Sequence, residues 1–167
     1  IYRLAGFNLL ADLCPRVPVI VETGSLRLPG NVSGDGNATM LFDELTAATG
    51  VVHSIDIDPV CGRNIAEHCG SQVVFHQWES VKALYELRDV FGKIDILYLD
   101  SLDVDFANDE LAARHALHEV QAATPMLKRS SIVAVDDNNP DGRGKGRLVS
   151  EYAALKGWPL LLDGYVK

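Results

Sequence analysis

The stretch Val17-Pro18-Val19-Ile20-Val21-Glu22-Thr23-Gly24-Ser25 sets the interpretation of the whole chain. Its apolar part, 17–21, predicts a buried strand, and an acid, a glycine and a serine follow at the strand's carboxyl end. A glycine-rich segment, a predicted helix and a second apolar strand that ends at Asp56 come next. Ligands of open α/β sheets bind beyond the carboxyl ends of the strands, where a later acid can bind ribose hydroxyls. The stretch therefore predicts a nucleoside-cofactor site.

Strands and helices alternate along the rest of the chain. Continuous apolar runs predict strands that are buried on both faces, and segments that begin at a proline or capping residue and end near a glycine predict helices. We expect strands over 17–21, 51–57, 72–76, 94–99, 131–135 and 158–162, and helices over 37–48, 59–69, 80–91, 108–122 and 146–156. This pattern predicts one α/β domain over residues 1–167, doubly wound, with a mainly parallel sheet and helices on both faces.

Composition narrows the range of partners. The net charge of -8 argues against a nucleic-acid partner, which would require clustered lysine and arginine. We expect no membrane partner either, because no apolar run is long enough to cross a bilayer and no secretory signal is visible. Cys14, Cys61 and Cys69 form no CxxC pair and favour a reducing, cytoplasmic setting.

Acidic residues follow the predicted strand ends one after another. Because the carboxyl ends of parallel strands share one edge, like charges would gather there, and such an edge favours a positively charged ligand. The alternative is that these acids cap the helices that follow. The residues concerned are Glu22, Asp56, Glu79, Asp100, Asp136 and Asp137.

Each acid has a functional and a structural interpretation. Asp56 suits a hydrogen bond to ribose hydroxyls, or it forms a turn ahead of Pro59. Glu79 and Trp78 are placed to flank an adenine ring, although Trp78 would equally suit the core. The carboxylates at 100, 136 and 137 offer hard oxygen ligands for Mg²⁺ or Ca²⁺, or they form an acidic loop held by backbone amides.

Five short motifs follow one another in a set order. They are Glu22-Thr23-Gly24-Ser25, Ser33-Gly34-Asp35-Gly36-Asn37-Ala38-Thr39, Ser54-Ile55-Asp56-Ile57-Asp58, Tyr98-Leu99-Asp100 and Val135-Asp136-Asp137-Asn138. Together they resemble the class I S-adenosylmethionine-dependent methyltransferases, and within them the metal-assisted O-methyltransferases of small molecules. The resemblance implies a Rossmann-like methyltransferase fold and transfer of a methyl group from S-adenosylmethionine to a hydroxyl of a small molecule.

The resemblance also implies roles for individual residues. Glu22, Thr23, Gly24 and Ser25 would line the methionine and sulfonium side of the cofactor, and Asp56 would bind its ribose. Trp78, Glu79 and Ser80 match the segment that borders adenine. Asp100, Asp136 and Asp137 match the residues that bind Mg²⁺ or another divalent cation.

The chain departs from the family pattern at the catalytic base and in the glycine-rich turn. The resemblance implies a basic residue three positions after Asp100, where this chain has Asp103. Asp103 or a histidine of the helix 108–122 is then the candidate to accept the proton. His115 and His118 share one face of that helix by their spacing, and we take Asp100, Asp103 and His118 as the catalytic set. The glycine-rich loop is longer than the family's, and substrate-recognition segments at the chain ends are expected to be missing.

Two other functions fit parts of the sequence. Gly34-Asp35-Gly36 followed by Asp56 loosely resembles the fingerprint of nicotinamide-dependent oxidoreductases, but its glycines do not directly follow the first strand. Asp103 in place of a base would also suit a non-catalytic binding module that keeps the fold. The sequence leaves the methyl acceptor and the oligomeric state open, a homo-oligomer included.

Overall fold

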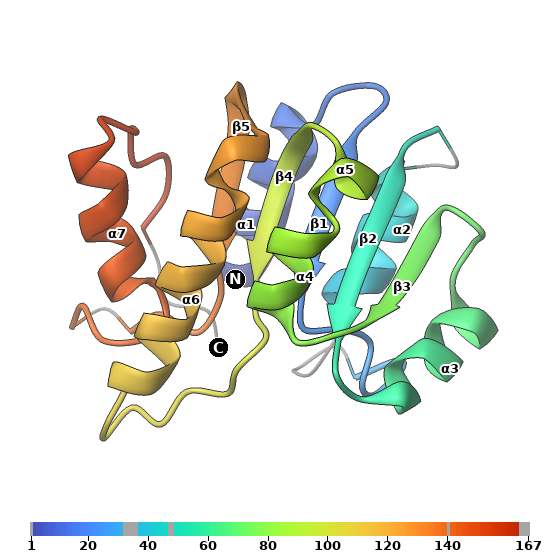
Figure 1. The fold of residues 1–167 in the computed structure, drawn as a ribbon, viewed down its shortest axis with the longest axis horizontal. Helices are drawn as coiled ribbons and strands as arrows, with labels where there is room; N and C mark the ends of the chain where they lie inside the picture. The colour runs from blue at the N-terminus through green and yellow to red at the C-terminus, as the bar shows by residue number, and fades with distance from the viewer. Residues whose placement is uncertain (1, 32–36, 47–48, 140, 164–167) are drawn as a thin grey trace.

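The computed structural model describes residues 2–31, 37–46, 49–139 and 141–163. Five strands form one sheet in the order β3-β2-β1-β4-β5, and every neighbouring pair is parallel (Figure 1). The strands are β1 (Val19–Thr23), β2 (Val51–Asp56), β3 (Val73–Gln77), β4 (Ile94–Leu99) and β5 (Leu127–Val135). From β1 the chain adds β2 and then β3 on one side of the sheet, and it then returns to add β4 and β5 on the other side of β1. The point where the order reverses therefore lies between β1 and β4, which is where such sheets bind ligands.

Helices cover both faces of the sheet (Figure 1). One face carries α1 (Tyr2–Leu13), α2 (Ala38–Thr46) and α3 (Pro59–His68). The other carries α4 (Ser80–Glu86), α5 (Arg88–Phe91), α6 (Glu110–Ala123) and α7 (Gly146–Leu155), and a 3-10 turn, η1 (Thr124–Met126), joins α6 to β5. The prediction of a doubly wound parallel sheet is confirmed. Within the described ranges, no helix combines the length and the apolar character needed to cross a bilayer.

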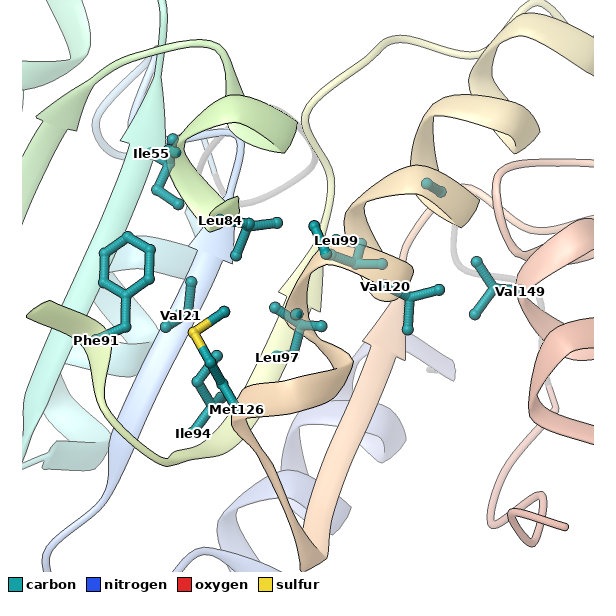
Figure 2. Close-up of a cluster of buried hydrophobic side chains, with 14 residues drawn as sticks. Val21, Ile55, Leu84, Phe91, Ile94, Leu97, Leu99, Val120, Met126 and Val149 are labelled. Atoms are coloured by element: carbon teal, nitrogen blue, oxygen red, sulfur yellow. The ribbon is translucent and has the colours of Figure 1, made fainter. Parts of the chain in front are cut away.

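Each face of the sheet has its own apolar core. In β1, Ile20 packs toward α1 and α2, whereas Val21 packs toward α4 and α6, because successive side chains of a strand point to opposite faces. Figure 2 shows the second core, in which Leu84 of α4 and Val120 of α6 gather over Val21 and Leu97. Two buried faces explain why the strands are continuous apolar runs.

Three expectations about the elements differ from the structure. The sequence analysis did not identify α1, and the predicted helix 80–91 is divided at Leu87 into α4 and α5. The predicted strand 158–162 is wrong, because no described strand pairs with this irregular segment and its leucines 160–162 are exposed. The end of the predicted helix 37–48 lies outside the described residues.

Candidate active site

The predicted acids do lie along one edge of the sheet. Glu22 is in register with Ser54 of β2 and Tyr98 of β4. The backbone N–H of Asp100 donates to Thr23 (2.8 Å), so the chain leaves β4 beside the end of β1. The backbone N–H of Asp136 donates to Leu99 (3.1 Å), so the chain leaves β5 beside the end of β4. Residues that are far apart in sequence therefore meet at the carboxyl edge.

Glu22 is buried near the end of β1, with 1% of its surface exposed. Burial raises the pKa of its carboxyl to about 8, and the nearby hydroxyls of Ser54 and Thr39 offset only part of this effect. Within the part of the chain that the structure describes, Glu22 Oε1 and the hydroxyl oxygen of Thr23 have no hydrogen-bond partner. Buried polar atoms are normally paired, so this corner suits a ligand that brings hydrogen-bond donors.

Gly24 makes the turn from β1 into the following loop. Its φ of 82° is one that L side chains rarely adopt, and a Cβ here would overlap the backbone carbonyl of Asp100. The next residue, Ser25, is buried and its hydroxyl lies 2.7 Å from that of Ser54. The predicted close approach of bare backbone at Gly24 is therefore present, while Ser25 links β1 to β2.

Asp56 and Trp78 lie side by side at the ends of β2 and β3. Asp56 Oδ1 accepts a hydrogen bond from the backbone of Asp58 (2.9 Å), so the turn-forming role is observed. The backbone N–H of Trp78 donates to the carbonyl of Asp56 (3.1 Å), and the Trp78 side chain is 38% exposed rather than part of the core. Lys82 Nζ lies 5.2 Å from the centre of the Trp78 ring. An aromatic surface thus borders the acid that the sequence assigns to ribose.

Glu79 caps α4, because its carboxylate accepts from the backbone N–H groups of Val81 (3.1 Å) and Lys82 (2.9 Å). The capping alternative is therefore observed at this position. Asp58, which the sequence analysis did not assign to the site, caps α3 in the same way.

A partly buried hydrogen-bond network connects the start of α4 with α6. Ser80 Oγ lies 2.9 Å from His115 Nε2, which is 3.4 Å from Glu119 Oε1. The hydroxyl of Ser101, the residue after Asp100, donates to the same Glu119 oxygen (2.7 Å). The hydrogen bond to Glu119 raises the pKa of His115 against the opposing effect of burial. The sequence analysis missed Glu119 and Ser101, and the spacing of Glu119 four residues after His115 was the available signal.

Neither of the two residues expected to accept the proton makes a hydrogen bond or ion pair with these acids among the contacts that the structure describes. Asp103 is exposed and pairs with Arg27 (3.0 Å), whose hydrogen bond holds the pKa of Asp103 below its ordinary value. His118 is exposed on α6, and no contact described by the structure joins it to Asp100. His115, by contrast, contacts Ser80 and Glu119, and Glu119 in turn bonds Ser101, the residue after Asp100.

A lysine lies between two of the predicted metal ligands. Lys145 Nζ is 2.5 Å from Asp100 Oδ1 and 2.8 Å from Asp137 Oδ2, and Lys145 is only 2% exposed. Burial by itself would lower the pKa of Lys145, but the two carboxylates outweigh it and raise the pKa, so the side chain is an ammonium. Asp136 accepts hydrogen bonds from the Tyr98 hydroxyl (2.6 Å) and the Asp137 backbone (2.8 Å).

This arrangement does not fit the expected divalent cation. Among the residues that the structure describes, no three histidine, cysteine or acidic side chains are grouped so as to hold a metal ion. An ion shared by Asp100 and Asp137 would have to displace the Lys145 ammonium. The sequence analysis assigned no role to Lys145, because nothing in its neighbourhood signals a partner 45 residues away.

This fold resembles that of the MycE methyltransferase of the mycinamycin biosynthetic pathway, solved in complex with Mg and S-adenosylhomocysteine (TM-score 0.61, 14% identity, 90% of this chain and 42% of that one). It also resembles the O-methyltransferase NovP (TM-score 0.65, 17% identity, 93% of this chain and 72% of that one). A third similar structure is a short-chain dehydrogenase/reductase of Serratia marcescens (TM-score 0.54, 15% identity, 82% of this chain and 63% of that one). No protein-family model matches the chain, and no curated protein matches its sequence.

These similarities establish the fold, a Rossmann-like methyltransferase fold, in agreement with the prediction. The chain spans less than half the length of the MycE structure. At identities of 14–17% the similarity carries no information on substrate, and the dehydrogenase shows that related folds host other chemistry.

Proposed function

We propose that this chain binds S-adenosylmethionine and transfers its methyl group to a hydroxyl of a small molecule. The observation that carries the proposal is the buried Glu22, whose Oε1 has no partner among the described residues, next to the bare backbone turn at Gly24. The methionine end of the cofactor brings an ammonium and a sulfonium, which would supply the missing donors and the positive charge. The similarity to methyltransferases solved with S-adenosylhomocysteine supports the same assignment.

The neighbouring residues suit the remainder of the cofactor. Thr23, whose hydroxyl has no partner among the described residues, and Ser25 would complete the methionine side. Asp56 keeps one carboxylate oxygen outside the turn hydrogen bond, and this oxygen would accept from the ribose. The exposed Trp78 ring would stack on the adenine, since aromatic faces pack well on bases, and Ser80 borders the same place.

When bound, S-adenosylmethionine supplies an activated methyl group. The protein would mainly hold the acceptor hydroxyl in line with the sulfur–methyl bond, which makes a bimolecular reaction effectively unimolecular. We assign proton acceptance to His115 in place of His118 and Asp103. Glu119 and Ser80 fix the ring, and the raised pKa makes its neutral form a stronger base. The proposed reaction uses no divalent metal, because Lys145 lies where the ion was expected.

Isothermal titration calorimetry tests the cofactor assignment. We expect the protein to bind S-adenosylmethionine and S-adenosylhomocysteine but not NAD. Glu22→Gln should weaken S-adenosylmethionine more than S-adenosylhomocysteine, because only the former carries the sulfonium charge. Glu86→Gln, at an exposed position of α4, is the matched control. Binding of NAD with no response to S-adenosylhomocysteine would assign the chain to the oxidoreductases instead.

His115→Gln tests the chemical step. It should remove methyl transfer while leaving cofactor binding intact, whereas His118→Gln should leave both unchanged. Cofactor binding with no turnover of any hydroxylated acceptor would favour the non-catalytic binding module.

A further inference from the structure

The loop between β5 and α7 is folded so that it holds Lys145 in one place. Asp137 adopts a positive φ of 53°, and Gly144 (φ 122°) packs so closely on the carbonyl of Asp137 that a Cβ would overlap it. The side chain of Asn138 accepts from the backbone of Gly146 (2.6 Å). Both residues that flank Lys145 are therefore tied to the start of the same loop.

A second set of contacts fixes this loop from outside. Asp109, just before α6, accepts from the backbone N–H of Gly144 (2.7 Å). Lys145 itself is bonded through its backbone N–H to the carbonyl of Asp137 (3.3 Å). Because Lys145 is hydrogen-bonded through its backbone and ion-paired through its ammonium, it is an internal part of the fold and not a mobile surface side chain.

The ammonium lies where a bridging cation would be coordinated. Oxygen ligands lie about 2.0–2.1 Å from Mg²⁺ and about 2.3–2.6 Å from Ca²⁺. Lys145 Nζ is 2.5 and 2.8 Å from carboxylate oxygens of Asp100 and Asp137, which come from the ends of two adjacent strands. The ammonium and a metal ion cannot share this space.

The third predicted ligand is also engaged inside the protein. Asp136 is 8% exposed, and its two oxygens accept from Tyr98 and from the Asp137 backbone. Tyr98 lies in the core between the sheet and α2, packed edge-on against Phe42. Turning Asp136 toward an ion would break a hydrogen bond that connects it to this core.

We propose that Lys145 is a built-in cation that takes the place of a divalent metal at the ends of β4 and β5. One chain therefore supplies both the carboxylates and their counter-charge, and the site excludes Mg²⁺ and Mn²⁺. This inference does not rest on methyl transfer, because it concerns ion binding in the free protein. If the proposed function holds, it makes the reaction insensitive to metal chelators.

Mn²⁺ titration followed by electron paramagnetic resonance tests the proposal on the whole chain. The wild type and Lys156→Ala, an exposed lysine at the end of α7, should bind no Mn²⁺ at this site. Lys145→Ala should bind one Mn²⁺, and Lys145→Ala/Asp100→Asn should lose it again. Lys145→Arg, which keeps the positive charge, should remain without metal.

Two results would overturn the proposal. One is Mn²⁺ binding by the wild type that disappears in Asp100→Asn. The other is a folded Lys145→Ala protein, verified by circular dichroism, that still binds no Mn²⁺. Should Lys145→Ala fail to fold, Lys145→Gln takes its place in the same titration, and the wild-type measurement stands by itself.

Discussion

Acidic residues lie both at the end of β1 and at the ends of β4 and β5, but the two places differ in what balances the negative charge. At the end of β1, Glu22 is buried with an oxygen that has no partner among the described residues. At the ends of β4 and β5, Asp100 and Asp137 share the ammonium of Lys145. We call these the cofactor half and the lysine half. An acid at a strand end therefore predicts a need for positive charge, but it does not predict whether a ligand or the chain itself supplies that charge.

Gly24 joins the two halves, and its replacement should have the largest effect. Gly24→Ala forces an L side chain into a left-handed conformation, which costs about 1–2 kcal/mol, and pushes a methyl group into the Asp100 backbone. We expect a total loss of about 3 kcal/mol or more in the free energy of unfolding. Urea denaturation measures it. Gly30→Ala is the control, since Gly30 has a similar φ of 80° with nothing within 4 Å. Equal losses in both variants would show that the contact between the halves is unimportant.

Lys145→Ala removes the counter-charge of the lysine half. Breaking a fully buried ion pair costs about 3–5 kcal/mol, and we expect roughly 2–3 kcal/mol here because Asp100 and Asp137 remain partly exposed to water. Thermal and urea unfolding check this value, with Lys156→Ala as the exposed control. If Lys145→Ala lost no more unfolding free energy than the control, water would solvate the carboxylates of Asp100 and Asp137 as favourably as Lys145 pairs with them.

Glu22 should give the cofactor half a stability that falls as the pH rises. Because burial raises the folded pKa from 4.5 to about 8, the neutral carboxyl stabilises the free protein fully below pH 4.5, and this contribution is lost as the pH approaches 8. Glu22→Gln should remove roughly 3 kcal/mol of the difference in unfolding free energy between pH 5 and pH 8. Denaturant titrations at the two pH values measure it, and Glu86→Gln should change nothing. An unchanged pH slope in Glu22→Gln would place the charged carboxylate in the free protein.

A histidine pair away from both halves provides the smallest effect and a reference for them. His53 Nδ1 lies 3.0 Å from His76 Nε2 beneath Phe91, and burial together with His76 lowers the pKa of His53 to about 4. Its contribution to stability is complete above pH 6.5 and is lost as the pH falls toward 4. His53→Phe should reduce the acid-induced loss by about 1 kcal/mol, measured as the shift in the midpoint of acid unfolding. The exposed His118→Gln should leave that midpoint in place.

The sequence was sufficient for most of the fold. Continuous apolar runs such as 94–99 predicted strands with two buried faces, and the acids after them were correctly expected on one edge. The strand predicted at 158–162 failed because apolar composition does not provide a neighbouring strand. The first helix, Tyr2–Leu13, has no acid in its first turn and no basic residue in its last, so the usual end signals were missing.

The candidate site was less predictable because it depends on contacts that the chain makes only after folding. Glu22 and Gly24 could be found from their position after a strand. Lys145 could not, since its partner Asp100 is 45 residues away and the connecting loop must fold back through Asp137 and Gly144. The same holds for Ser101 and Glu119, which meet only when α6 packs on the sheet.

A crystal structure of the protein soaked with S-adenosylhomocysteine and Mn²⁺ tests the contrast between the two halves most directly. We expect cofactor density beside Glu22 and Gly24, and the ammonium of Lys145 between Asp100 and Asp137 with no anomalous manganese peak. A manganese peak between those two carboxylates, with Lys145 displaced, would contradict it, and so would cofactor density that lies away from Glu22.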